Sequence, residues 1–297
     1  MNIIKNRYIY ISISIIIIAI GLGFMFYNNS QGKGFFNYDI QFTGGTSIEI
    51  SLDGKEVNND DIKKLLKDSI GVDNAQIQIV GEGKSVIIKT HSLTQEQRIA
   101  FTDAISKKYN LTDKDYSIRD ISATISDEMK KTSVLAILVS CIGMLIYVSF
   151  RFKNFTTGAS AIIALIHDAL ILISFYAIIR IPLNDAFIAA ILTILGYSIN
   201  ATIVIFDRIR ENKGRAGKID EKLINDGINQ SLRRSVFTSL TTFFTVICLY
   251  IFGVESVKIF ALPIAIGIIC GTYSSIFIAG PIWYMLNNIK NVKAKNN

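Results

Sequence analysis

The sequence predicts a polytopic α-helical membrane protein with six transmembrane helices and one α+β domain outside the membrane. Half of the 297 residues are hydrophobic and only 19% are charged, where a soluble globular protein carries about 25% charged residues. The hydrophobic residues form long runs, and the polar segment 28–131 separates the first run from the others. The mean hydropathy of +0.40 excludes a disordered chain, a collagen-like chain and a typical cytosolic enzyme.

Six apolar runs are long enough to span a bilayer, which takes about 20 residues. They are residues 8–27, 132–150, 157–179, 186–206, 235–254 and 259–289. The length of the last run indicates a helix that is tilted or that extends past the membrane. Basic residues before the first run are also typical of a signal peptide. The run exceeds the usual core of about 7–15 residues, so we expect an uncleaved anchor.

The basic residues of the loops predict the orientation of the chain. With a cytoplasmic N-terminus, fifteen Lys and Arg residues lie in inside segments, and only Arg180 and Lys258 lie in the short outside loops. Basic residues concentrate in cytoplasmic loops. We therefore expect a cytoplasmic N-terminus and first span (1–27), an extracytoplasmic domain (28–131), a five-helix bundle (132–289) and a basic cytoplasmic tail (290–297), with both termini in the cytoplasm.

The extracytoplasmic segment has its own pattern of short elements. Ile48 and Ile50 alternate with polar residues as in a half-buried strand, and Thr94 with Gln97 forms a capping box that opens a helix. The expected elements are a strand at 38–52, a helix at 59–70, strands at 75–80 and 85–90 around a turn at 81–84, a helix from 94 to about 109, and a strand at 116–121. The order βαββαβ is that of a ferredoxin-like domain, a fold that hosts many functions.

The sequence lacks the residues that several classes of functional site require. The outer domain has one histidine, His91, and no cysteine, while Cys141, Cys248 and Cys270 lie inside apolar runs. This distribution disfavours a metal site and a disulfide framework. No nucleophile with a neighbouring base is visible, and the acids and bases of the outer domain nearly balance. We expect no enzymatic activity, no cofactor, no metal and no nucleic-acid partner.

One ionisable residue lies deep in an apolar run. Asp168 is placed about 17 Å into its helix at 1.5 Å per residue, near the middle of a hydrocarbon core of about 30 Å. Such a residue is a candidate for a proton relay or an ion pathway, and the alternative is a permanently neutral carboxyl that bonds a neighbouring helix. His167 precedes it, but adjacent helical residues point about 100° apart, so the two need not act as a pair.

Polar side chains also follow faces of two later helices. Threonines at helical spacing in the fifth run either bind a carboxyl group across an interface or hold helices together; they are Thr238, Thr241, Thr242 and Thr245. The fourth run carries a similar stripe of Gly196, Ser198 and Asn200. In the sixth run, Gly267 and Gly271 have the spacing of a close-packing motif.

Four segments together resemble motifs of one family. The segment YDIQFTGGT (38–46), with Gly44, Gly45 and Thr46, is similar to the glycine-rich signature of SecD and SecF proteins, and IHDAL (166–170) resembles their third-helix motif. GYSINATIVIFDRIREN (196–212), with Gly196, Asp207 and Arg208, resembles the SecF fourth-helix signature. SLRRSVFTSLTTF (231–243), with Arg233 and Arg234, resembles the fifth-helix motif. The single outer domain resembles SecF rather than SecD.

This resemblance implies an RND-like half-transporter in the bacterial plasma membrane. It implies an accessory subunit of the Sec translocase that, with SecD, promotes late protein export using the proton or sodium gradient. The implied partners are SecD, the SecYEG channel, SecA, YidC, translocating preproteins and membrane lipids. The family often carries an aspartate directly after the fourth-helix asparagine, where this chain has Ala201. Coupling would then rest on the partner, on Asp168 or on Asn200.

Two other functions share parts of this pattern. An RND-type exporter of lipids or small molecules has the same architecture, although such exporters are usually twice as long with two large outer domains. A scaffold or receptor that binds a partner through its outer domain is the second alternative, and the intramembrane Asp168 and the threonine stripe argue against it.

Overall fold

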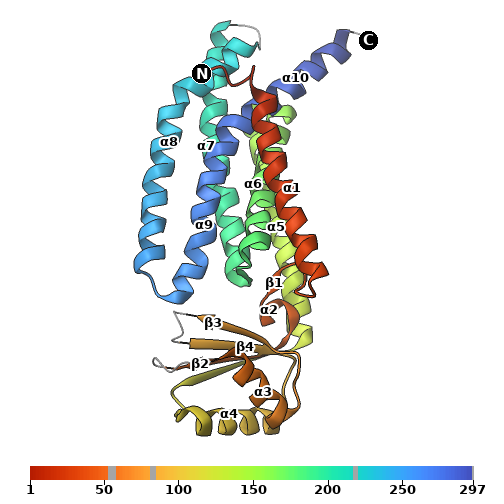
Figure 1. The fold of residues 1–297 in the computed structure, drawn as a ribbon. Coiled ribbons are helices and arrows are strands. Elements are labelled where there is room, and N and C mark those ends of the chain that lie inside the picture. Colours follow the sequence, from red (N-terminus) through yellow and green to blue (C-terminus); the bar gives the residue numbers. More distant parts are fainter. Residues whose placement is uncertain (53–57, 81–84, 217–219, 296–297) are drawn as a thin grey trace. The chain divides into compact units, whose positions relative to one another are not determined.

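The protein consists of two compact units. The computed structural model describes residues 1–52, 58–80, 85–216 and 220–295. Met1–Asn37 and Val134–Asn297 form the first unit, here called the membrane unit, and Tyr38–Ser133 form the second, the polar unit. Figure 1 shows that the N-terminus and the last helix lie at the same end of the helix bundle. The turn expected at 81–84 lies outside the described residues.

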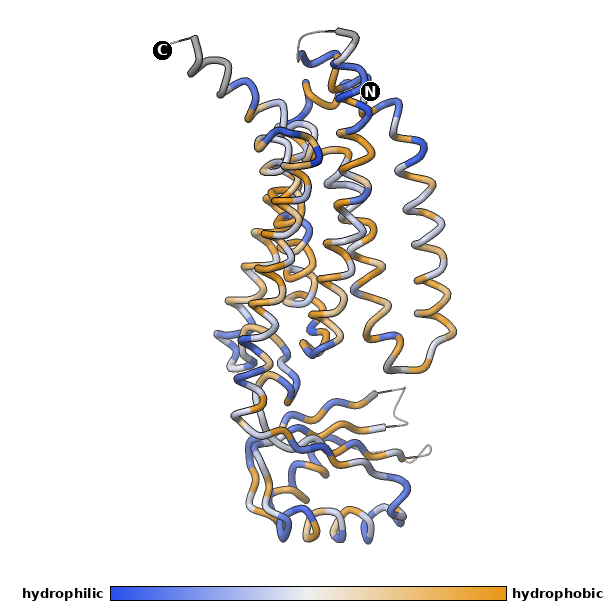
Figure 2. Tube along the Cα trace, turned by 180° about the vertical axis from the view of Figure 1, so that it is seen from behind, coloured by the Kyte–Doolittle hydropathy of each residue, from blue (hydrophilic) through white to orange (hydrophobic). Residues whose placement is uncertain are grey.

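Long helices make up the membrane unit. The described part of the chain holds six helices that are long and apolar enough to cross a membrane, which confirms the six predicted spans. The first five are α1 (Arg7–Ser30), α5 (Ala123–Phe152), α6 (Phe155–Ile179), α7 (Asp185–Ala216) and α8 (Glu221–Phe252). Hydrophobic residues follow these helices along most of their length (Figure 2). Helix α5 begins earlier than the apolar run because polar residues such as Asp127 and Lys130, paired at 3.0 Å, continue the helix.

The sixth span is not one uniform helix. Helix α9 (Glu255–Ser274) continues as a π-helical turn, η1 (Ser275–Ala279), and then as α10 (Gly280–Lys295). A π turn replaces the usual hydrogen bonds between residues i and i+4 with bonds to i+5, and it occurs often at functional sites. This turn therefore changes which residues of the span face the other helices.

Glycines bring pairs of helices into close contact. A Cβ atom added to Gly267 would lie 2.2 Å from the Ile194 side chain, and one added to Gly271 would lie 2.9 Å from Ser198 Cβ. The close-packing motif predicted in the sixth run is therefore confirmed, with α7 as its partner. A similar contact joins α1 to α6, where a Cβ atom on Gly21 would lie 2.1 Å from Ser174 Cβ.

Hydrogen bonds connect the loop after α6 to the segment that follows α1. The Arg180 guanidinium donates to the carbonyl oxygens of Lys33 at 2.7 Å and Gly34 at 2.9 Å. The Asn37 side-chain amide donates to the Arg180 carbonyl oxygen at 2.9 Å. Two short strands, β1 (Asn37–Tyr38) and β6 (Pro182–Leu183), lie in these segments. The end of the first span is thus tied to the loop between the third and fourth spans.

Four strands and two helices form the body of the polar unit. They are β2 (Gly45–Ser51), α3 (Asn59–Ile70), β3 (Gln76–Val80), β4 (Ser85–Thr90), α4 (Gln95–Tyr109) and β5 (Tyr116–Ile121). The sheet has the order β3-β4-β2-β5, and all of its pairs are antiparallel. Its core packs Ile48 and Ile88 from the sheet with Leu66 and Phe101 from the helices. The capping box at Thr94 and Gln97 is present, and hydrogen bonding to the Thr94 hydroxyl lowers the pKa of Glu96.

The strand expected at 38–52 is shorter than predicted. Residues Ile40–Thr43 form a helical turn, α2, and the strand β2 begins only at Gly45. Gly44 and Gly45 have φ angles of +72° and +120°, and a Cβ atom on Gly45 would lie 2.1 Å from the Thr90 carbonyl oxygen. The alternating Ile40 and Phe42 fit either structure, so the two glycines decide where the strand starts.

Candidate functional site

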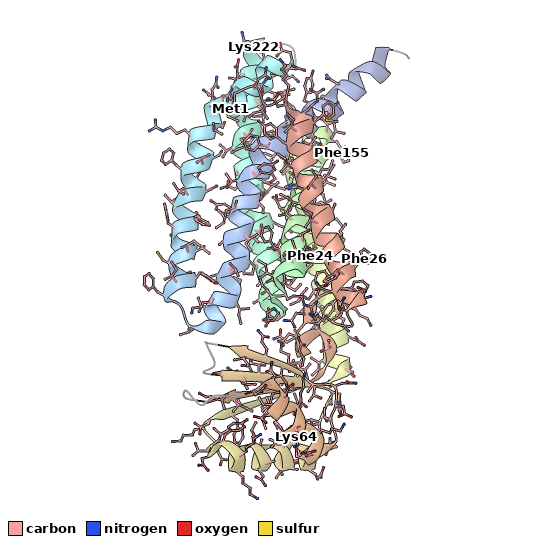
Figure 3. All side chains as sticks on the ribbon, in the orientation of Figure 1. Met1, Phe24, Phe26, Lys64, Phe155 and Lys222 are labelled. Carbon is pink, nitrogen blue, oxygen red and sulfur yellow. The ribbon has the colours of Figure 1, made fainter. Side chains whose placement is uncertain are left out.

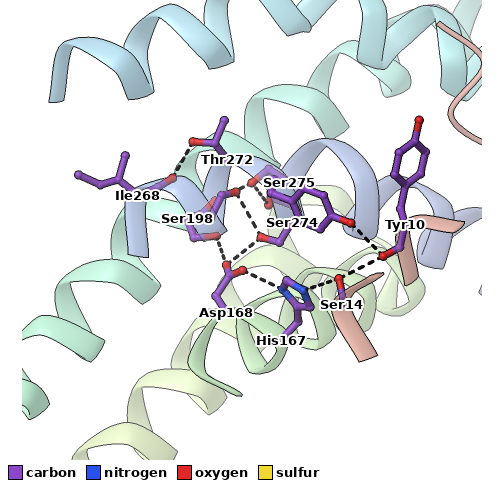
Figure 4. Close-up of polar contacts among 12 residues, drawn as sticks. Tyr10, Ser14, His167, Asp168, Ser198, Ile268, Thr272, Ser274 and Ser275 are labelled. Carbon is purple, nitrogen blue, oxygen red and sulfur yellow. Dashed lines mark hydrogen bonds and ion pairs between the residues drawn. The ribbon is translucent and has the colours of Figure 1, made fainter. Parts of the chain in front are cut away.

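Asp168 lies fully buried on α6 and is held by hydroxyl groups from two other helices. Ser198 Oγ on α7 donates to Asp168 Oδ2 at 2.6 Å, and Ser274 Oγ at the end of α9 donates to the same oxygen at 2.8 Å (Figure 4). The Asp168 side chain has no exposed surface. A buried carboxyl group is stable only with such partners, so three helices meet at this one oxygen.

His167 pairs with Asp168, although the two residues are adjacent on the helix. His167 Nδ1 lies 3.0 Å from Asp168 Oδ1, and His167 Nε2 lies 2.8 Å from Ser14 Oγ on α1. The expectation that the neighbours need not pair is thus corrected, because both side chains bend toward each other despite their different starting directions. The imidazole also stacks on Tyr273, with ring centroids 6.1 Å apart.

Polar contacts continue from His167 to the first span. Ser14 Oγ donates to the Tyr10 carbonyl oxygen at 3.2 Å, and Tyr273 Oη donates to the same oxygen at 2.9 Å. A continuous series of hydrogen bonds therefore links Ser198 and Ser274 through Asp168 and His167 to Ser14 (Figure 4). Groups linked in this way can pass protons between positions that water does not reach.

The π turn adds a second polar contact beside the first. Ser275 Oγ lies 2.9 Å from Thr202 Oγ1 and donates to the Ser198 carbonyl oxygen at 3.3 Å. Both Ser274 and Ser275 are fully buried. The two consecutive serines thus bond different helices. Ser274 bonds the carboxyl group on α6, and Ser275 bonds a backbone carbonyl and a hydroxyl group of α7.

The other predicted polar stripe lines a separate cavity. A cavity of about 140 Å³ lies between α7 and α8. Its lining residues are Tyr197, Asn200, Ala201, Val204, Arg234, Ser235, Thr238, Ser239, Thr241 and Thr242. The hydroxyls of Thr241, Thr242 and Thr245 donate to carbonyl oxygens one turn earlier on their own helix, as does that of Thr238. The structure therefore brings the threonine stripe to Asn200 and not to Asp168.

Arg234 stands out in this cavity because no acid among the described residues pairs with it. In the described ranges of the chain, no carboxylate forms an ion pair with Arg234, whereas Asp207 pairs with Arg151 at 3.1 Å and Arg208 pairs with Glu211 at 2.7 Å. Arg233 lies over the Phe237 ring at 5.7 Å. Asp207, Arg208 and Arg233 thus have charged or aromatic partners, whereas Arg234 lines a cavity whose lining residues include no acid.

The glycine-rich motif has a structural part in the polar unit. Thr46 is fully buried, accepts a hydrogen bond from the Leu93 backbone N–H at 2.9 Å and donates to Asp120 Oδ1 at 2.5 Å. Asp120 in turn pairs with Arg98. The motif therefore joins the start of β2 to the loop before α4 and to β5.

Three residues of the Asp168 cluster escaped the sequence analysis. Ser14 and Ser274 lie in apolar runs where serine commonly bonds its own helix, and Tyr273 looks like one more aromatic residue of a span. Ser198 belongs to the stripe noted on the fourth run, but the spacing did not assign it to Asp168. The one available signal is the pair Ser274-Ser275, two consecutive hydroxyls in an otherwise apolar segment.

Comparison with known proteins places the chain in a family. The family model described as "Protein export membrane protein SecD/SecF, C-terminal" matches residues 101–289. The chain belongs to the SecD/SecF family. The SecF translocase subunit of Thermodesulfovibrio yellowstonii is 37% identical over 86% of this chain and 86% of its own length. That of Sebaldella termitidis is 35% identical over 86% of this chain and 83% of its own length.

Longer members of the family match over one part of their chains. The SecDF translocase subunit of Bacillus subtilis is 35% identical over 83% of this chain but only 34% of its own length. The crystal structure of SecDF from Thermus thermophilus superposes with a TM-score of 0.86 at 32% identity, covering 97% of this chain and 39% of that chain. The fold is thus that of one part of SecDF, and the SecF relatives correspond to nearly the whole chain.

Proposed function

We propose that this chain is the SecF-type accessory subunit of a protein translocase and promotes protein export across the bacterial plasma membrane. The observation that carries this proposal is the match to SecF subunits over 86% of both chains. That match disfavours the alternative of an RND-type exporter for lipids or small molecules. Depletion of the chain should slow export of secreted proteins, and unchanged export rates would contradict the proposal.

The partner that completes the protein is SecD. The SecDF relatives carry the region matched here as one part of a longer chain, so the remainder would come from a separate SecD subunit in an RND-like assembly. The cavity that holds Arg234 and lacks an acid supports a membrane partner that supplies a carboxylate. SecYEG, SecA, YidC, preproteins and lipids are further partners that the family implies. Co-purification with SecD tests the first of these.

Both termini lie in the cytoplasm in this proposal, and residues 28–131 lie outside. The support is the ratio of fifteen inside to two outside basic residues. Lys64 on the polar unit and Lys222 at the start of α8 are exposed and suited to labelling (Figure 3). In a variant without Cys141, Cys248 and Cys270, Lys64→Cys should react with a membrane-impermeant thiol reagent in intact cells, and Lys222→Cys should not. Equal labelling of both would contradict this orientation.

The polar unit is proposed to be a ferredoxin-like extracytoplasmic domain. The order β2-α3-β3-β4-α4-β5 and the antiparallel sheet β3-β4-β2-β5 support this assignment. Residues 37–123 expressed alone should unfold cooperatively. The Gly44→Val, Gly45→Val double variant should lower the melting temperature, because both positions have positive φ angles. A melt equal to that of the wild type would contradict the role of these glycines.

Asp168 is the proposed relay through which a proton or sodium gradient acts on this subunit. Its burial and its hydrogen bonds to two other helices, α7 and α9, support this role. Asp168→Asn keeps the shape and removes the titratable proton, so assembly with SecD should persist while gradient-dependent export into inverted vesicles is lost. Ser160→Ala, a buried α6 serine that bonds the Thr157 carbonyl oxygen, is the control. Full ionophore-sensitive export by Asp168→Asn would exclude the relay.

A further inference from the structure

The hydrogen bonds of Ser14 determine which nitrogen of His167 carries a hydrogen. A serine hydroxyl has one hydrogen to donate, and Ser14 donates it to the Tyr10 carbonyl oxygen at 3.2 Å. With that hydrogen directed to the Tyr10 carbonyl oxygen, Ser14 Oγ acts as the acceptor towards His167 Nε2, 2.8 Å away. Nε2 carries a hydrogen as a result. Tyr273 Oη also donates to the Tyr10 carbonyl oxygen, at 2.9 Å.

The two oxygens of Asp168 have different roles. Oδ2 accepts from Ser198 at 2.6 Å and from Ser274 at 2.8 Å, so donors already surround it. Oδ1 faces His167 Nδ1 at 3.0 Å, and this contact needs one hydrogen between the two atoms. The hydrogen is either on the carboxyl group, with a neutral imidazole, or on Nδ1, with a carboxylate and an imidazolium.

Other proton counts do not fit this environment. With no hydrogen between Oδ1 and Nδ1, two lone pairs would face each other and a bare carboxylate would be buried. With two hydrogens, two donors would face each other and a bare cation would be buried. In the part of the chain that the structure describes, His167 is the only base within ion-pair distance of Asp168. An uncompensated charge inside a bilayer is costly, so the pair is neutral as a whole.

We propose that Asp168 and His167 share a single proton between Oδ1 and Nδ1, and that Ser14 and Ser274 are positioning residues that keep it there. Ser14 holds Nε2 in its protonated form, which leaves Nδ1 to face the carboxyl group. Ser274, the last residue before the π turn, keeps Oδ2 as an acceptor. The place of this proton in coupling rests on the proposed relay, whereas the arrangement of the proton does not.

Spectroscopy of the full chain in lipid bilayers tests the proton count. The chain has two histidines, so His91→Gln, a change at an exposed position of the polar unit, leaves His167 as the only histidine signal. Nitrogen-15 NMR then reports the protonation of Nδ1 and Nε2. Infrared spectroscopy reports a protonated carboxyl group, assigned to Asp168 by its loss in Asp168→Asn.

We expect a protonated Nε2 together with one of two combinations. Either the ring is neutral and the Asp168 carboxyl band is present, or the ring is cationic and the band is absent. An unprotonated Nε2 would overturn the proposal. So would a neutral ring without the carboxyl band, or a cationic ring with it.

Variants of Ser14 test its positioning role separately. Ser14→Ala removes the acceptor of the Nε2 hydrogen, so the nitrogen-15 signal of Nε2 should shift to that of a protonated nitrogen without a hydrogen-bond acceptor. Ser14→Thr keeps the hydroxyl and should restore the wild-type spectrum, and Ser160→Ala should not alter it. An unchanged spectrum in Ser14→Ala would overturn the role of Ser14. These spectra do not depend on export, so a failure of the translocase proposal and a failure of this one are distinguishable.

Discussion

Two polar regions of the membrane unit, the Asp168 cluster and the α7–α8 cavity, are built from opposite faces of the same helix. Ser198 on α7 donates to the buried Asp168, while Asn200, two residues later, lines the cavity with Arg234. The cluster satisfies its carboxyl and imidazole groups within the chain. In the cavity, no described acid pairs with Arg234. The cluster is therefore complete by itself, and the cavity is suited to a group from another chain.

The largest expected effect is the removal of the central carboxyl group. Asp168→Leu leaves the polar atoms of His167, Ser198 and Ser274 without their shared partner, and should destabilise the membrane unit by about 3–5 kcal/mol. Denaturant unfolding of the purified chain in detergent measures this loss. Wild-type stability of Asp168→Leu would mean that the cluster does not hold the helices together.

A matched pair of substitutions on α7 compares the two regions directly. Ser198→Ala removes a donor from a buried carboxyl group and should cost about 1–3 kcal/mol. Asn200→Ala acts on an exposed residue and should change the stability of the isolated chain by about 0.5 kcal/mol or less. The same unfolding assay measures both. Equal losses would contradict the division into a satisfied cluster and an open cavity.

Ala201→Asp should give Arg234 a counter-charge within the chain. Both residues line the same cavity, and a partly exposed ion pair contributes about 0–1 kcal/mol. A double-mutant cycle with Arg234→Gln isolates this interaction. Strictly additive effects on unfolding would mean that the two side chains do not meet.

The smallest effect is expected for the threonine stripe. Thr241 is exposed, and its hydroxyl donates to the Thr238 carbonyl oxygen of its own helix. Thr241→Val should therefore change the stability of the isolated chain by about 0.5 kcal/mol or less. A loss above 1 kcal/mol in the unfolding assay would show that the Thr241 hydroxyl bonds a group outside its own helix.

The order of the helices and strands along the chain could be predicted from the sequence, because each span and most short elements have a local signal. Helix α3 at Asn59–Ile70 and strands β4 and β5 have the predicted bounds. The strand predicted at 38–52 was wrong in its first part, because the sequence positions of Ile40 and Phe42 are compatible with a helical turn as well as with a strand. The π turn after Ser274 also has no local signal, since its hydrogen bonds depend on packing against α6 and α7.

The candidate site could be predicted only at its centre. Asp168 is recognisable because a carboxyl group in an apolar run is costly. Its partners are not, because Ser14, Ser198 and Ser274 come from three different helices, and the spacing within one helix does not specify how it is rotated against the next. The threonine stripe shows the opposite case, a clear periodic pattern whose hydroxyls donate to carbonyl oxygens of their own helix, with one cross-helix contact in which Thr242 accepts from Tyr197 Oη.

The glycine contacts group the helices around Asp168 into two closely packed pairs, α1 with α6 and α9 with α7, here called blocks. Gly21 brings α1 close to α6, and Gly267 with Gly271 brings α9 close to α7, so close packing would oppose sliding within either pair. Shear between the two pairs would meet less resistance. Asp168 stands on that plane, with Oδ1 bonded inside its own block to His167 and Oδ2 bonded across it to Ser198 and Ser274. Sliding of one block past the other would remove the Ser198 and Ser274 donors from Oδ2 and leave the contact between Oδ1 and His167 intact, so the displacement would change the hydrogen bonding of a single carboxyl group.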